Sequence, residues 1–230
     1  MKGVYFDNLH SYNDLNLILS NVVIEPPEVK KKKIEVPGTN GEIDLTEFDG
    51  NIYYRNRYIS FSFVVKEERA NWASVFTRVS NAIHGKEMDI VLDDDSGFVW
   101  HGRVSVLKHA RTSGIDTIEV EVDAEPYKYS KTSSLEDITW DDFNLESGIM
   151  QSFEDIAVDG TKKVEVFGYR KNVVPVIIVA GTISVIYNGI TTALSSGRNK
   201  VLHIVIKEGV NTLTFTGSGT VSIEFVGGSL

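Results

Sequence analysis

The sequence predicts a mainly β protein with two domains, a β-rich N-terminal domain with one α-helix packed on it and a C-terminal β-sandwich. Three observations lead to this prediction. Several segments of the first half alternate polar and apolar residues, one segment between them has helical spacing, and the second half has short strands separated by glycine turns. For the 230 residues, we expect domains at 1–130 and 151–230, joined by a polar connector at 131–150.

The first well-specified element is a chain reversal in the segment VPGTNGEIDLTE, residues 36–47. Pro37-Gly38 and Asn40-Gly41 are turn dipeptides, because proline fixes its own φ while glycine and asparagine accept a positive φ. Strand-like runs flank them. No nucleophile, histidine or metal-ligand cluster accompanies the turn, so its predicted role is to fit against another part of a larger structure.

An aromatic strand and a helix follow this reversal. The segment YYRNRYISFSFVV, residues 53–65, alternates polar and apolar side chains from Tyr58 onward, which predicts a strand. A helix is predicted over about residues 67–85, where the apolar residues form one stripe: Trp72, Val75, Phe76, Val79, Ala82 and Ile83. Gly85 follows the last of them and suits the left-handed residue that often ends a helix.

Further strands are expected at residues 88–92, 98–107 and 115–124, with an acidic turn at 93–97, and Pro126 ends the last of them. In the second half, short strands are predicted at residues 163–167, 174–179, 184–187, 200–206, 211–215 and 220–225. The expected turns between them include Asn188-Gly189 and Gly217-Ser218-Gly219.

The composition excludes several classes of function. The formal net charge of −9 gives no global electrostatic footprint for nucleic acid or an anionic membrane. The chain has no cysteine, so it has neither disulfides nor thiolate metal sites. We expect no signal peptide, because Asp7, Asn8 and His10 interrupt the N-terminal segment, and no membrane insertion, because no apolar run approaches the roughly 18 residues of a spanning helix.

No catalytic, cofactor or metal site is predicted. The five histidines form no HExxH pair, and the chain has neither a GxSxG nor a phosphate-loop pattern. The run Asp93-Asp94-Asp95-Ser96-Gly97 lacks the ligand spacing of a calcium loop, so we expect these acids to solvate a turn. Acidic residues are plentiful, yet none forms a distinct pair for hydrolysis, and the chain is predicted not to be an enzyme.

A local basic run, Lys30, Lys31, Lys32 and Lys33, has two interpretations. In an extended segment, such lysines solvate a strand and discourage unwanted pairing of its edge. In a symmetric assembly, the same run repeats into a basic ring that faces a channel and forms a path for a polyanion.

The order of motifs over residues 1–130 resembles the distal tail protein (Dit) family of long-tailed phages and prophages of Gram-positive bacteria. The resemblance rests on Phe6-Asp7-Asn8-Leu9-His10-Ser11, Pro26-Pro27, VPGTNGEIDLTE, the Trp72 helix ending in NAIHGK, Trp100-His101-Gly102-Arg103 and Ala124-Glu125-Pro126-Tyr127-Lys128. The C-terminal segment from Gly217 to Leu230 is also similar to the end of the family.

This resemblance implies a structural virion protein of the siphophage tail tip, assembled in the host cytoplasm. The N-terminal domain then forms a ring, typically a hexamer, and the C-terminal domain is a galectin-like or carbohydrate-module-like sandwich. The implied partners are other copies of the chain, the tail tube, the tail-associated fibre or lysin protein, the tape-measure protein and the receptor-binding protein. DNA passes through such a hub without sequence-specific binding.

In a ring, complementary strand edges and well-defined turns matter more than reactive groups. We therefore predict that Pro37, Gly38, Asn40, Gly41 and Asp44 lie at or near a subunit interface. The alternative function is a carbohydrate-binding adhesion module that acts through the C-terminal sandwich, where exposed aromatic residues such as Tyr169 and Tyr187 could stack on sugars.

Overall fold

The computed structural model describes residues 2–38, 40–112, 114–131, 134–135 and 153–230. These residues divide into two compact units. The N-terminal unit comprises Met1–Asp95, Val99–Lys128 and Leu230, and the C-terminal unit comprises Ser96–Phe98 and Tyr129–Ser229. Most of the expected connector at 131–150 lies outside the described residues.

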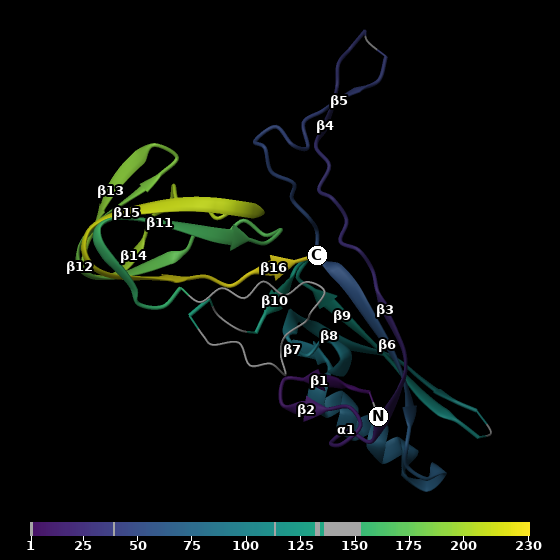
Figure 1. Cartoon of the computed structure of the whole chain (residues 1–230). Coiled ribbons are helices and arrows are strands. Elements are labelled where there is room, and N and C mark those ends of the chain that lie inside the picture. The colour runs from purple at the N-terminus through teal and green to yellow at the C-terminus, as the bar shows by residue number, and fades with distance from the viewer. Residues whose placement is uncertain (1, 39, 113, 132–133, 136–152) are drawn as a thin grey trace. The chain divides into compact units, whose positions relative to one another are not determined.

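One antiparallel sheet organises the N-terminal unit, with the strand order β2-β1-β7-β8-β9-β6-β3 (Figure 1). Its strands are β1 (Val4–Phe6), β2 (Leu9–His10), β3 (Leu17–Ile24), β6 (Arg57–Val65), β7 (Glu87–Leu92), β8 (Phe98–Arg111) and β9 (Asp116–Ala124). The fold class predicted from the sequence, mainly β with one helix on the N-terminal sheet, is confirmed.

Alternation along β6 explains how this sheet builds a core. Ile59, Phe61 and Phe63 are buried, and the intervening side chains are more exposed, as a period of two requires. The predicted strand begins too early, because β6 starts at Arg57 rather than at Tyr53. The four preceding residues belong to a different feature, described below.

The helix lies where its apolar stripe predicts. A 3₁₀ turn, η1 (Arg69–Asn71), leads into α1 (Trp72–Ile83). Every residue of the predicted stripe is buried or packs against the core of this unit. Gly85 follows with φ of 77°, and the Trp72 indole N–H donates to the Glu67 carbonyl over 2.9 Å, fixing the start of the helix.

The acidic turn between β7 and β8 is more than a solvated tip. It forms the 3₁₀ turn η2 (Asp93–Asp95), in which the Asp93 carboxylate accepts a hydrogen bond from the Gly3 amide at 2.6 Å. Asp93 also lies 3.2 Å from His10 Nε2, and Asp95 pairs with Lys128 at 2.6 Å. The prediction that these acids solvate the turn was therefore wrong for Asp93 and Asp95, which bond to residues distant in sequence.

We expect Gly3→Ala to destabilise the N-terminal unit by about 1 to 3 kcal/mol. A Cβ at this position would lie 2.5 Å from Nε2 of the buried His10 ring, so either the ring or β1 must shift. Urea unfolding followed by tryptophan fluorescence measures the change. Gly114→Ala is the matched control, because a Cβ there meets nothing within 4 Å, and equal stability of the two variants would contradict the expectation.

The C-terminal unit is a five-stranded antiparallel sheet of long strands. Its order is β11-β15-β12-β13, with β14 also paired to β12. The strands are β11 (Ile156–Gly168), β12 (Val176–Tyr187), β13 (Ile190–Leu194), β14 (Gly197–Lys200) and β15 (Gly209–Glu224). Two short strands, β10 (Lys128–Ser130) and β16 (Gly228–Ser229), pair with each other, and β10 also pairs with β8, so both belong to the sheet that contains β8.

Three glycines on β12 and β15, which we call the glycine line, let this sheet fold over itself. Gly181, Gly217 and Gly219 have φ values of 125°, 133° and 145°, and Gly181 pairs with Gly219 across β12 and β15. Ile177, before the line, and Ile183, after it, belong to one buried cluster, so both halves of the sheet face a common core.

Two local predictions in this unit were wrong. The Gly217-Ser218-Gly219 segment is not a turn, because β15 continues through it from Gly209 to Glu224. Most of residues 200–206 form no strand, since β14 ends at Lys200 and only the bridge of Val173 with Ile206 follows. Asn188-Gly189 does form the expected turn, with φ of 49° and 77°.

Candidate interaction surface

A long arm, residues 25–56, leaves the end of β3 and returns to the start of β6 (Figure 1). Near its base, the Lys30 amide donates to the Tyr53 carbonyl and the Arg55 amide donates to the Glu28 carbonyl, both over 2.8 Å. Further out, β4 (Lys33–Glu35) pairs with β5 (Glu42–Asp44) as a separate two-stranded sheet. The arm therefore departs from the main sheet as a self-paired ribbon.

The arm contributes nothing to the buried core of its unit. All six residues of β4 and β5 are exposed, including the apolar side chains of Ile34 and Ile43. An isolated two-stranded ribbon is marginally stable in water, and exposed apolar residues on it are typical of contact surfaces. The arm is therefore the strongest candidate in the described residues for an interaction surface.

The residues predicted to lie at an interface are all on this hairpin. Gly38 and Gly41 have φ of 82° and 84°, so the turn uses the backbone freedom that its sequence predicts. Asp44 ends β5, and its carboxylate accepts a hydrogen bond from the Thr46 amide at 2.9 Å. Bonds from the Thr46 hydroxyl and amide hold the pKa of Asp44 below its usual value. Their contact with a neighbouring subunit remains a prediction.

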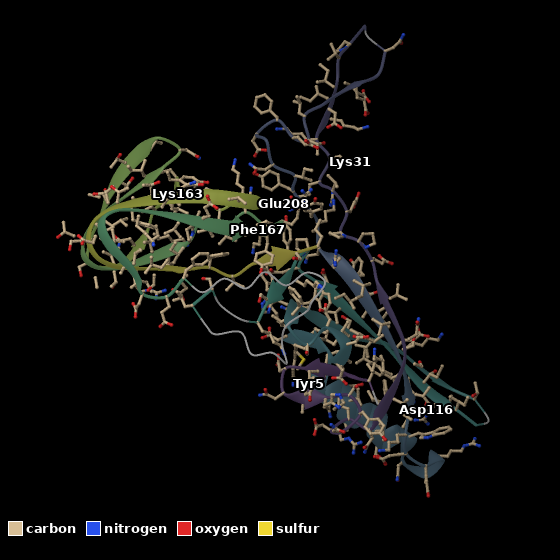
Figure 2. The ribbon with its side chains drawn as sticks, viewed as in Figure 1. Tyr5, Lys31, Asp116, Lys163, Phe167 and Glu208 are labelled. Atoms are coloured by element: carbon tan, nitrogen blue, oxygen red, sulfur yellow. The ribbon has the colours of Figure 1, made fainter. Side chains whose placement is uncertain are left out.

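The four lysines of the basic run also lie on the arm, and all are exposed (Figure 2 labels Lys31). Lys33 pairs with Glu42 across the hairpin at 2.9 Å, and this interaction raises the pKa of Lys33. The Lys32 amide donates to the Thr46 hydroxyl over 3.1 Å. The run is thus part of the ribbon edge, and its position is compatible with both interpretations of the sequence.

A compact turn, residues 46–50, forms a knob on the side of the arm. The Gly50 amide donates to the Glu47 carbonyl over 2.8 Å, and the Tyr53 hydroxyl donates to the Asp49 carboxylate over 2.6 Å. The Tyr53 hydroxyl and the Asn51 amide hold the pKa of Asp49 below its usual value. Phe48 projects from this braced turn with 85% of its surface exposed. Sequence reasoning missed the knob, although its Phe-Asp-Gly order is a recognisable turn signal.

A pocket of about 610 Å³ opens in the N-terminal unit, and we call it the mouth pocket. Its apolar lining comes from Leu19, Val22 and Ile24 of β3 and from Leu92. Its polar lining includes Lys2, Asp94, Asp95 and Lys128, together with the buried side chains of Arg57 and Trp100. None of these residues was singled out as a site from the sequence.

The histidines and acids that the structure describes form no evident reaction centre. His109 bonds to the fully buried Asp116 and stacks on Phe76 at 4.3 Å between ring centroids, which indicates a packing role. In the described part of the chain, no group of three or more histidines and acids could hold a metal ion. None of its helices is both long and apolar enough to span a bilayer.

The two aromatic residues considered for sugar stacking are not on an open face. Tyr187 is buried, and its hydroxyl donates to the Val205 carbonyl over 2.5 Å. Tyr169 packs against the core of the C-terminal unit, and burial raises the pKa of its hydroxyl. The expectation that Tyr187 could stack on a sugar was therefore wrong, because the alternation of β12 turns its ring inward. Tyr169 lies just beyond β11 and is half-buried.

Comparisons with known proteins point to one fold. No protein-family model and no curated protein sequence matches the chain. Among solved structures, the chain is similar to the crystal structure of the SPP1 Dit (gp 19.1) protein, described as a paradigm of the hub adsorption apparatus in phages that infect Gram-positive bacteria. The TM-score is 0.68 at 10% sequence identity, and the match covers 100% of both chains. The chain thus has the fold of a Dit hub protein.

Proposed function

We propose that this chain is a structural hub subunit of a phage tail tip, located at the distal end of the virion. The observation that carries the proposal is the fold match to a Dit protein over the whole of both chains. The proposed partners are the tail tube on one side and the fibre or lysin, tape-measure and receptor-binding proteins of the adsorption apparatus on the other. The proposed role is mechanical rather than catalytic.

The proposed hub is a closed ring of identical subunits, with six as the expected number. The exposed, self-paired arm supports this proposal, because it offers strand edges and apolar side chains that its own unit does not cover. Each arm would contact the next subunit around the ring, and the turn at Pro37 to Asp44 would lie at that contact. Light scattering and negative-stain microscopy of the purified protein test for a closed ring.

We expect Gly41→Val to weaken ring assembly while leaving the rest of the fold intact. Gly41 has φ of 84°, which valine rarely adopts, and no other atom lies within 4 Å of the added Cβ. The strain would therefore distort only the hairpin tip. Light scattering should show a shift toward smaller species, with an unchanged circular dichroism spectrum. Assembly at the wild-type concentration would argue against the tip as an interface.

In the proposed ring, Lys30, Lys31, Lys32 and Lys33 of each subunit face a channel through which DNA passes. Replacing all four with glutamate should lower phage infectivity by roughly tenfold or more, because repulsion would oppose passage of a polyanion. Adsorption and the number of assembled tails should not change. The control replaces the exposed Lys162 and Lys163 of β11 with glutamate. Normal infectivity of the arm variant would favour a solvated edge.

A further inference from the structure

Two residues that line the mouth pocket have a buried N–H donor for which the described residues provide no acceptor. Arg57 is 6% exposed and Trp100 is 3% exposed. Neither Arg57 Nε nor Trp100 Nε1 has a hydrogen-bond partner in the described part of the chain. Burial lowers the pKa of Arg57, which reflects the cost of removing a charged guanidinium from water. A buried cation and a buried indole N–H on one pocket call for an acceptor with negative charge.

The other charges of the mouth pocket already have partners. Lys2 lies 3.4 Å from Asp94, and Lys128 lies 2.6 Å from Asp95. These two pairs balance each other in charge. Among the described residues, Arg57 is therefore the cationic side chain of this lining that forms no ion pair.

The acids near the base of the arm do not pair with Arg57 either. Arg57 also borders a polar pocket of about 580 Å³ whose lining includes Glu25, Glu28 and Asp123. Glu28 pairs instead with Arg55 at 3.4 Å. In the described ranges, none of these three carboxylates forms an ion pair with Arg57. Arg57 is therefore available to pair with an acid from outside this unit.

The knob on the arm has the chemistry that the mouth pocket lacks. It presents an aromatic ring, Phe48, between the carboxylates of Glu47 and Asp49. Phe48 is the most exposed of the large apolar side chains in the described residues, so it does not occupy the mouth pocket of its own chain. Bonds from Tyr53 and the Asn51 amide hold the turn in place, which lowers the entropy lost on docking.

We propose that the knob of one copy docks in the mouth pocket of a second copy. Phe48 packs on the apolar wall of Leu19, Val22 and Ile24, and a knob carboxylate forms an ion pair with the Arg57 guanidinium. This inference rests on the proposed self-assembly of the chain. It adds the pair of surfaces that meet and the reason for their specificity, an acid on the knob that pairs with a cation in the pocket.

Intermolecular disulfide formation tests the contact directly, because the natural chain has no cysteine. One preparation carries Phe48→Cys, and a second, distinguishable by a tag, carries Ile24→Cys at the rim of the pocket. Oxidation of the mixture should give a covalent heterodimer, and neither protein alone can form that species. The control pairs Ile24→Cys with Val210→Cys, an exposed site on the C-terminal unit.

Adding Arg57→Glu to the pocket partner should reduce the yield of the heterodimer at least about tenfold, because a carboxylate would then face the knob carboxylates. Arg57→Met, which removes the charge without reversing it, should reduce the yield less and guards against misfolding as the explanation. Tryptophan fluorescence must show that both variants remain folded. An unchanged yield in both variants would overturn the role of Arg57.

The outcomes also separate this inference from the proposed function. If the wild type forms closed rings but the Phe48→Cys and Ile24→Cys proteins give no heterodimer above the Val210→Cys control, the docking proposal is wrong and the hub proposal stands. If the heterodimer forms but microscopy shows only open dimers, the contact is correct and the ring is not.

Discussion

Gly219→Ala should unfold the C-terminal unit selectively, with an expected loss of about 3 to 5 kcal/mol. Gly219 has φ of 145°, and an added Cβ would lie only 2.0 Å from the Ala180 carbonyl oxygen on β12. That oxygen belongs to a paired strand, so it cannot move without disrupting the pairing of β12 with β15. Backbone strain and steric overlap therefore add at the same residue.

Hydrogen exchange followed by mass spectrometry in increasing urea measures this loss in peptides from β11, β12 and β15. Gly160→Ala is the matched control, because Gly160 also has a positive φ of 80° but meets nothing within 4 Å. Gly160→Ala should lower the free energy of unfolding by about 1 kcal/mol, from backbone strain alone. If the two variants lost the same free energy of unfolding, the close approach of β12 to Gly219 would not contribute to the loss.

Phe63→Ala should destabilise the N-terminal unit by about 3 to 5 kcal/mol. Phe63 is fully buried on β6, and its ring lies 6.0 Å from that of Phe61 and 6.3 Å from that of Phe6. Removing the ring leaves a cavity beside the rings of Phe6 and Phe61, because the surrounding side chains can fill it only in part.

Urea unfolding followed by the fluorescence of Trp72 and Trp100, both in this core, measures the effect. Tyr58→Ala on the same strand is the control, since its side chain is on the exposed face and its loss should cost less than about 1 kcal/mol. A midpoint for Phe63→Ala that matched the Tyr58→Ala midpoint would be incompatible with the core described above.

The elements predicted correctly are those whose cause is local. The helix could be located because its stripe repeats every three or four residues, and every member of the stripe meets the core. The hairpin of the arm could be predicted because Gly38 and Gly41 determine the turn by themselves. Neither prediction needs knowledge of residues far along the chain.

The predictions that failed depend on distant residues. Gly217-Ser218-Gly219 has the composition of a turn, yet glycine is required there because β12 passes so closely. The acids of η2 have Gly3, His10 and Lys128 as partners, which lie far from them in sequence.

The mouth pocket had one local signal. Arg57 is in phase with Ile59 and Phe61 on β6, so strand alternation places a charged residue on the buried face. An arginine in register with core positions indicates a missing partner or a functional pocket. Trp100 gave no comparable signal, because a buried tryptophan is ordinary and only the structure shows that its N–H is unpaired.

The pairing of β10 with β16 has an evolutionary consequence. Apart from the short segment Ser96–Phe98, the C-terminal unit runs from Tyr129 to Ser229, and the Ser130 amide donates to the Gly227 carbonyl over 3.1 Å. Its entry and exit strands are therefore hydrogen-bonded neighbours. A module whose two ends lie side by side can be exchanged, enlarged or lost by recombination without altering the spacing of the remaining chain. In the proposed hub, the C-terminal unit can therefore diversify while the N-terminal unit stays unchanged.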